Sequence, residues 1–409
     1  MRSKLITIQS FLFYCIPIGL LTGPFIPDLF LSFIGLIFIY ITFTEKKWQY
    51  FNNNFFLLFF IFYIYLLFTS LISDHALYSL KNSFFYFRFG LFALATWFLI
   101  NEKEHFIKIF SITFSITFLI TIFSGYYQFI NSINIFGFTG QENRLTLLLN
   151  DKLILGGYLA RLSPLMIGLL FLNIRNKNEA LFYSIISIII IVLIFLTGER
   201  TSIIISIGSA IFILLISHRF RYVGAIVLFL STIIITLILL NSQNLMKRNI
   251  IFTLEQTNVL NYFKAMENKL VLFSPQHQSH FITAYRMFEA KPIFGHGAET
   301  FRLICQEDKF QYDTISCSTH PHNTYIQLLS EIGIVGMIPI LIIIFHLINR
   351  IRLNFSSSLY RLSDYEIFLI ATIAITLWPI APTQNFFNNW INIIYYLPVG
   401  FYLQTLYKK

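Results

Sequence analysis

Arg200 stands where a buried charge would be expensive, between two long apolar stretches of the chain. It belongs to the sequence Thr197-Gly-Glu-Arg-Thr-Ser202, which joins one apolar stretch to the next. Free N–H groups at a helix N-terminus, together with hydroxyls and a guanidinium, would form an anion site. A tight turn whose arginine reaches the membrane surface is the alternative that this short sequence leaves open.

Three further arginines lie inside or beside apolar stretches. Arg161 lies within Gly156-Gly-Tyr-Leu-Ala-Arg-Leu-Ser-Pro164, Arg144 lies in the preceding segment 131–152, and Arg88 lies in an aromatic run. Each could simply pair with a carboxylate or with backbone carbonyls. Several arginines with few acidic neighbours favour a multiply charged anion, such as a diphosphate, and we expect all three to line its site.

A second polar group begins with His320-Pro-His322-Asn323 and leads into another apolar stretch. A neutral histidine at a membrane boundary is suited to removing a proton from a sugar hydroxyl. We expect His320, Asn323 and Gln327 to line the same site. Two close histidines also suggest a metal, but no Asp or Cys completes a ligand spacing. We therefore expect neither a metal nor another cofactor.

The elements that must position these residues are apolar helices. Of the 409 residues, 56% are hydrophobic and 12% are charged, and the mean hydropathy is +0.70. Such a composition implies that much of the surface faces lipid. The long apolar runs lack the alternation of barrel strands, which leaves helices. The net charge of +10 is better explained by loop charges that fix membrane topology than by binding to nucleic acid.

We expect an all-α polytopic membrane protein with about twelve spans of about 20 residues each. Alternate connections between the spans are rich in Lys and Arg, which places both termini in the cytoplasm and segment 241–321 outside. The chain then divides into spans one to nine (1–241), an external and mostly helical loop domain (242–321) and spans ten to twelve (322–409). The predicted spans are 5–22, 25–43, 55–73, 78–100, 106–129, 153–173, 180–197, 200–217, 221–241, 322–349, 364–382 and 388–407.

The external loop contains two further features. Cys305 and Cys317 lie twelve residues apart in a compartment that permits oxidation, so a disulfide is predicted, with two free thiols as the alternative. Arg286 opens a stretch that reads as a helix ended by Pro292, followed by the glycine-flanked turn 295–297. From the sequence alone, Arg286 is equally consistent with a solvated surface position.

His322-Asn323, followed by nine residues and Gly333, matches the H-N-x9-G motif of the O-antigen ligase family. The chain resembles this family of the O-antigen ligase and polymerase superfamily, which are bacterial inner-membrane glycosyltransferases of the GT-C type. The resemblance extends to Gly198-Glu-Arg-Thr-Ser202 and to the stretch from Arg286 to Gly297. It covers most of the chain. Glu199, directly before Arg200, departs from the family pattern. A carboxylate at this position would weaken an anion site if it pointed inward.

The resemblance implies metal-independent, inverting transfer of a glycan from undecaprenyl diphosphate to an acceptor hydroxyl at the periplasmic face. Arg200 and Arg286 would bind the diphosphate, helped by Arg144 and Arg161, and His322 would act on the acceptor. A ligase, which we favour, would use lipid A-core as acceptor, whereas a polymerase would use another lipid-linked repeat unit. A transporter of lipid-linked sugars is the third interpretation. It fits less well, because the polar residues cluster in the outer half of the spans.

Overall fold

The computed structural model describes residues 2–141, 144–172, 177–256, 274–356, 361–379 and 382–407. Within these ranges the regular structure is helical, apart from two isolated β-bridges. The principal helices are α1 (Arg2–Tyr14), α2 (Ile16–Gly19), α3 (Phe25–Glu45), α4 (Asn54–Leu71), α5 (Ala76–Ser83), α6 (Phe87–Glu102), α7 (Phe106–Asn131), α8 (Leu155–Phe171), α9 (Lys177–Leu196), α10 (Arg200–Ile216), α11 (Arg221–Asn241), α12 (Gln243–Met246), α13 (Phe252–Gln256), α15 (Pro275–Ala290), α16 (Phe301–Ile304), α17 (Thr324–Ser356), α18 (Asp364–Thr376) and α19 (Asn389–Leu406).

The described helices include six that are long and apolar enough to cross a membrane. They are α3, α4, the continuous α5–α6 unit, α7, α11 and α17. The bent pair Arg2–Tyr14 and Ile16–Thr22 would add a seventh span, and α8, α10 and residues 181–196 of α9 are shorter apolar helices. An all-α polytopic membrane fold is therefore consistent with the structure, whereas the count of twelve spans remains a prediction.

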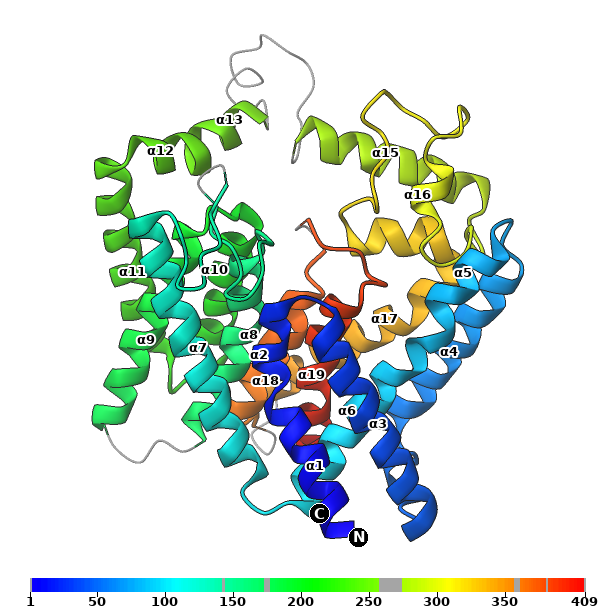
Figure 1. Cartoon of the computed structure of the whole chain (residues 1–409), viewed down its shortest axis with the longest axis horizontal. Helices are drawn as coiled ribbons and strands as arrows, with labels where there is room; N and C mark the ends of the chain where they lie inside the picture. The colour runs from blue at the N-terminus through cyan, green and yellow to red at the C-terminus, as the bar shows by residue number, and fades with distance from the viewer. Residues whose placement is uncertain are drawn as a thin grey trace.

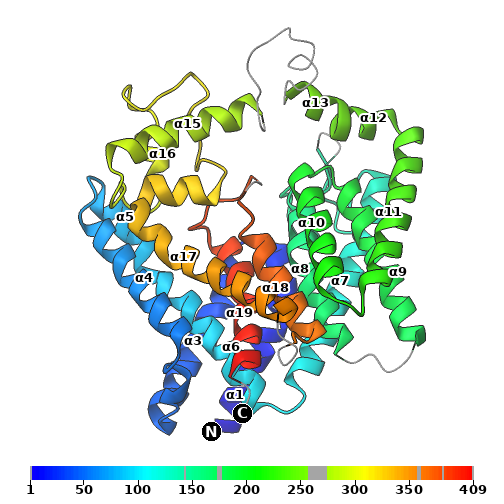
Figure 2. The same ribbon diagram turned by 180° about the vertical axis from the view of Figure 1, so that it is seen from behind.

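The helices form two groups with a central layer between them (Figures 1 and 2). One group contains α7 to α11, and the other contains α3 to α6 with α17, while α18 and α19 lie between. α19 packs along α6, and α18 packs along α8, so the central layer ties the groups together. Both termini lie at one end of the bundle, and α12, α13, α15 and α16 lie at the other. Which side of the membrane each end faces stays a prediction.

Helix α17 breaks sharply at Gly333. The backbone there has φ +68°, a left-handed conformation that glycine adopts without a steric penalty. A Cβ atom at this position would lie 2.2 Å from the carbonyl oxygen of Ile293. Segment 292–297 packs against the break, so a side chain at position 333 would have no space.

The break exposes backbone carbonyls, and the segment 292–297 satisfies them. The N–H groups of His296 and Gly297 donate to the carbonyls of Ser330 and Glu331, at 3.2 and 2.7 Å. The next carbonyl accepts the hydroxyl of Tyr65, at 2.6 Å. Buried carbonyls without partners would be costly, so these bonds make the break stable. The two glycine-containing motifs of the sequence therefore form one structural unit.

Candidate functional site

Four imidazole rings meet at the outer end of α17, and we call them the histidine cluster. His277 and His280 come from α15, and His320 and His322 come from the segment before α17. The ring centroid of His322 lies 4.1 Å from that of His320, 5.1 Å from His277 and 5.4 Å from His280. The sequence pointed only to the second pair. His277 and His280 carry no motif, and only the docking of α15 brings them here.

The backbone at Thr383 holds His322 in place. His322 has φ +58°, which is uncommon for a residue other than glycine. Its carbonyl accepts the N–H of Thr383 at 2.8 Å, and the His320 Nε2 atom lies 3.2 Å from the Thr383 carbonyl oxygen. Two contacts to the same residue therefore fix the segment that carries both rings. Such strained positions persist where the surroundings over-determine them.

The histidine cluster is neutral at pH 7. Burial, and to a smaller extent the three neighbouring rings, lowers the pKa of His322 to about 3. Burial also lowers the pKa of His320 to about 4. It lowers the pKa of His277 and His280 as well. The cluster therefore offers lone pairs rather than positive charges. Among the described residues, no group of three or more His, Cys, Asp or Glu is placed to hold a metal ion.

Asn323 begins α17. Its side-chain oxygen accepts the N–H groups of Tyr325 and Ile326, at 3.0 and 3.1 Å, so it caps the free end of the helix. Its amide nitrogen donates to the carbonyl of Pro379 at 2.8 Å. Asn323 thus links α17 to the segment that follows α18. The structure gives it an anchoring role, in place of the substrate contact expected from the sequence.

Gln327 is fully buried one turn further along α17. Its amide nitrogen donates to Asn385 Oδ1 at 2.7 Å and to Glu331 Oε2 at 3.0 Å. Its oxygen accepts the N–H of Phe386 at 2.9 Å. Both donor hydrogens of the amide are thereby used within the protein. Gln327 therefore stabilises the wall behind the histidine cluster, and we leave it out of the proposed substrate contacts.

Arg144, Arg161, Arg200 and Arg248 form a second group, the arginine cluster, around Glu199 and the turn between α9 and α10. Arg200 donates from Nη1 to the Thr253 hydroxyl at 3.2 Å, and Arg248 donates from Nε to the Gly198 carbonyl at 3.2 Å. Both contacts join the turn between α9 and α10 to the segment after α12. Burial, followed by the charges of His280 and Arg200, lowers the pKa of His277. Arg200 contacts Thr253 of α13, and α13 lies at the same end of the bundle as α15, which carries His277.

Arg248 lies in a π-helical turn, Lys247–Ile251. Such turns are rare and are frequently found at functional sites. Asn249 beside it is 7% exposed, and its side-chain amide has no partner among the described residues. Sequence reasoning missed both residues. Their positions in a polar stretch of the loop looked ordinary, and only the fold returns this stretch to Gly198.

The Glu199 carboxylate accepts hydrogen bonds from backbone N–H groups at the start of α8. Its Oε1 accepts the N–H of Gly156 at 2.7 Å, and its Oε2 accepts those of Gly157 and the Ser202 hydroxyl, each at 3.0 Å. The carboxylate therefore caps the N-terminus of α8. Burial raises the pKa of Glu199, and the charge of Arg144 and these hydrogen bonds oppose that shift. The departure from the family pattern thus has a structural use.

Arg161 and Arg144 retain unused hydrogen-bond donors. Arg161 is 5% exposed, and its closest hydrogen bond runs from Nη1 to the Gly157 carbonyl at 3.4 Å. Arg144 donates to the carbonyl of Leu153. The Nε–H of each is buried and has no partner among the described residues. Buried donors are normally satisfied, so an anion that accepts from these groups would complete the site.

Arg88 and Arg286 lie apart from the two clusters. Arg88 makes an ion pair with Asp28 at 2.8 Å and donates to Asn389 at 2.8 Å, which is the carboxylate pairing left open by the sequence. Arg286 donates to the carbonyl of Gln311 at 2.7 Å. Nine helical positions separate it from His277, and at 3.6 residues per turn this places the two side chains on opposite sides of α15. The structure therefore does not bring Arg286 to the arginine cluster.

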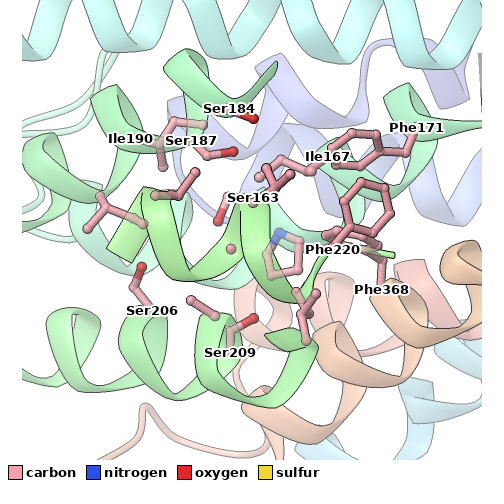
Figure 3. A pocket seen from close by; sticks show the side chains of 17 residues that line it. Ser163, Ile167, Phe171, Ser184, Ser187, Ile190, Ser206, Ser209, Phe220 and Phe368 are labelled. Carbon is pink, nitrogen blue, oxygen red and sulfur yellow. The ribbon is translucent and has the colours of Figure 1, made fainter. Parts of the chain in front are cut away.

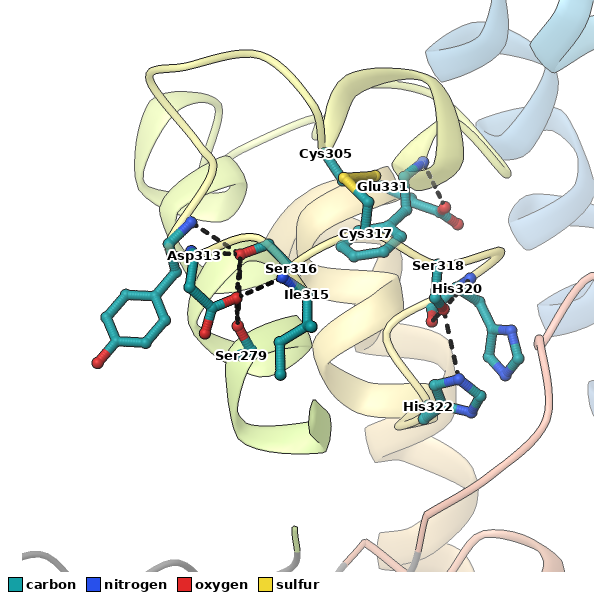
Figure 4. Close-up of a disulfide and its surroundings, with 12 residues drawn as sticks. Ser279, Cys305, Asp313, Ile315, Ser316, Cys317, Ser318, His320, His322 and Glu331 are labelled. Atoms are coloured by element: carbon teal, nitrogen blue, oxygen red, sulfur yellow. Dashed lines mark hydrogen bonds between the residues drawn. A yellow bond between two sulfur atoms is a disulfide. The ribbon is translucent and has the colours of Figure 1, made fainter. Parts of the chain in front are cut away.

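Cys305 and Cys317 form a disulfide, as Figure 4 shows. Cys305 follows α16, and Cys317 directly precedes the segment that carries Ser318, His320 and His322. The bond ties this segment to the small apolar core of the loop domain, which contains Met287 and Phe301. The disulfide therefore belongs to the support of the histidine cluster.

The bundle also contains a cavity of about 100 Å³ between α8, α9, α10 and α11 (Figure 3). Its walls are mainly apolar, with hydroxyls from Ser163, Ser206 and Ser209. No described residue that lines it is charged. It is too small for a sugar chain and has no group that could bind a diphosphate. The chemistry therefore belongs to the two clusters.

The structure places a cluster of arginines and a cluster of neutral histidines at the end of the helical bundle opposite the termini, and a comparison with protein families adds to this picture. Residues 185–341 match the family model described as O-antigen ligase. This O-antigen ligase region, residues 185–341, contains Arg200, Arg248, the loop domain and His322. The predicted resemblance is confirmed over this region, and it supports a glycosyltransferase of the ligase or polymerase type that acts on lipid-linked glycans. No curated protein matches the chain.

Proposed function

We propose that the protein transfers a glycan from undecaprenyl diphosphate to an acceptor hydroxyl at the periplasmic face of the bacterial inner membrane. The proposal rests on one observation above the others: the arginine cluster and the neutral histidine cluster lie at the same end of one helical bundle. It takes over the predicted topology of twelve spans, with both termini in the cytoplasm and the loop domain outside.

The arginine cluster would bind the donor diphosphate. Arg200, Arg161, Arg144 and Arg248 carry positive charge, and the nearby carboxylate of Glu199 accepts hydrogen bonds from backbone N–H groups of α8. When the bond between the anomeric carbon and the phosphate oxygen breaks, the electron pair stays on the diphosphate. Guanidinium groups placed around that oxygen stabilise the developing charge, so the reaction as proposed needs no metal.

His322 would take the proton of the acceptor hydroxyl. The hydroxyl oxygen then attacks the anomeric carbon from the face opposite the leaving diphosphate, which inverts the configuration. A base must be neutral to accept a proton, and the lowered pKa of His322 keeps it neutral at physiological pH. His320, which packs 4.1 Å from His322 between ring centroids, would limit the movement of the base.

Two arginines that the sequence predicts at the diphosphate site lie elsewhere in the structure. Arg286 remains in the proposal on the resemblance alone, because its guanidinium is held at the Gln311 carbonyl. Arg88 is left out, because its ion pair with Asp28 uses its charge within the bundle. For the acceptor we favour lipid A-core, as expected for a ligase. A second lipid-linked repeat unit, as expected for a polymerase, is the alternative.

A reconstituted assay tests the proposal. Purified protein in liposomes receives an undecaprenyl-diphosphate-linked glycan and either lipid A-core or a second lipid-linked repeat unit. We expect glycan transfer to lipid A-core, and equal rates with and without EDTA. Transfer only to the repeat unit would identify a polymerase. Absence of transfer to both acceptors, or loss of activity in EDTA that a divalent ion restores, would contradict the proposal.

A further inference from the structure

Ser318 lies directly beside the proposed base. Its hydroxyl oxygen is 2.6 Å from the His320 carbonyl oxygen and 3.3 Å from His322 Nε2 (Figure 4). The His320 N–H also points to the Ser318 oxygen, at 3.3 Å. Neither the family motif nor the residue type drew attention to this serine. Its role follows from counting the hydrogen atoms that it can donate.

A serine hydroxyl has one hydrogen and can accept two hydrogen bonds. A carbonyl oxygen cannot donate, so the short contact to His320 must use the single hydrogen of Ser318. The Ser318 oxygen is then only an acceptor toward His322, and Nε2 of His322 must donate the hydrogen between them. A neutral imidazole carries one hydrogen. The lone pair therefore resides on Nδ1.

We infer that Ser318 is a positioning residue, which holds His322 in the tautomer with the hydrogen on Nε2 and presents Nδ1 as the proton-accepting atom. This inference rests on the proposed function and adds the identity of the reacting nitrogen. In the transfer step, Nδ1 takes the acceptor proton while the new glycosidic bond forms. Nε2 keeps its hydrogen, which stabilises the imidazolium through the Ser318 oxygen.

The left-handed backbone of His322 supports this assignment. Its φ of +58° and the bond from Thr383 N–H to its carbonyl fix the position of the Cβ atom. With Cβ fixed, the contact at Nε2 determines the rotation of the ring. The other rings packed against His322 are those of His320, His277 and His280, with centroids 4.1, 5.1 and 5.4 Å away. Ser318 is thus the hydroxyl described as bonded to His322, and the other rings form its walls.

The first test observes the tautomer directly. Protein labelled with 15N at its nine histidines and reconstituted in lipid is studied by NMR, and the His322 signals are assigned by their loss in His322→Gln. We expect a protonated Nε2 and an unprotonated Nδ1 in the original protein. In Ser318→Ala we expect a mixture of both forms. A protonated Nδ1 in the original protein would overturn the inference, whatever the activity.

The second test separates positioning from folding. Ser318→Ala should lower kcat about tenfold, the effect of one lost hydrogen bond at its upper range, with KM for the donor unchanged. Ser318→Thr keeps the hydroxyl and should restore most of kcat. The neighbouring Cys305–Cys317 disulfide, detected on a non-reducing gel, reports that the segment has folded. If Ser318→Ala is fully active and His322→Ala is inactive, the inference about Ser318 is refuted and the proposed base stands. If both variants are fully active, the proposed base is refuted.

Discussion

The arginine cluster and the histidine cluster are built in opposite ways. Arg200 begins α10 and Arg161 lies inside α8, and the nearby carboxylate of Glu199 caps the start of α8. The histidines are neutral, because burial lowers their pKa, and His322 sits on strained backbone. The first region therefore supplies positive charge, and the second supplies a lone pair. A transferase needs both, one for the leaving group and one for the incoming hydroxyl.

The largest predicted effect separates the two regions by function. Arg200→Ala should abolish both donor binding and transfer, because it removes charge from the diphosphate. His322→Ala should lower transfer by about 10²- to 10⁴-fold, the usual contribution of a general base, yet leave donor binding intact. Binding of the lipid-linked donor in liposomes is measured separately from turnover.

Arg200→Lys is the matched control for this comparison. A lysine retains the charge but cannot form the two parallel hydrogen bonds of a guanidinium, so binding should recover only in part. Loss of donor binding in His322→Ala would contradict the division between the clusters. Retention of donor binding in Arg200→Ala would contradict it equally.

A smaller effect is expected from Glu199. In Glu199→Gln the side chain keeps one oxygen, and its amide group would face a backbone N–H that the carboxylate now accepts. One buried donor loses its partner, which should cost about 1–3 kcal/mol of stability. Thermal unfolding in detergent measures the change. The exposed Glu104→Gln serves as control and should unfold like the original protein. Equal unfolding of both variants would show that Glu199 is not a structural cap.

The smallest effect concerns pH. An ordinary histidine, with a pKa near 6.5, would lose its lone pair to a proton as the pH falls to 5. The pKa of His322 lies near 3, so the transfer rate should stay nearly constant between pH 7 and pH 5. Stability should behave differently. The unfolded chain takes up protons below about pH 6.5 that folded His320 and His322 exclude, so the folded state loses stability as the pH falls.

Initial rates in the liposome assay and unfolding temperatures at the same pH values check this pair of expectations. A rate that halves near pH 6.5 would mean that His322 titrates as an exposed imidazole. It would also remove the contrast between a charged and a neutral cluster.

The sequence predicts the features that depend on composition or on short motifs. The helical bundle follows from apolar runs, and the turn at Arg200 and the segment at His322 follow from residue types that are costly near lipid. The resemblance of the O-antigen ligase region rests on the same motifs. These signals are local, so a single sequence carries them.

What the sequence does not predict depends on packing between distant segments. His280 reaches His322 only because α15 docks against α17, and Arg248 reaches Gly198 only because the chain folds back after α12. The polar groups of Gln327 looked free for a substrate, because its partners lie about 60 positions further along the chain. Residue type alone cannot distinguish an anchoring amide from a binding one.

The break in α17 also determines how deep the site lies in the bilayer. An unbroken helix of 33 residues would be roughly 50 Å long, well beyond a hydrocarbon core of about 30 Å. Because the helix turns at Gly333, the part that follows is of spanning length, and the polar first part can lie along the lipid headgroups. A thicker or thinner bilayer would then be accommodated by tilt of the long part. The short part, held by segment 292–297 and Tyr65, would keep His322 at a constant depth below the aqueous surface.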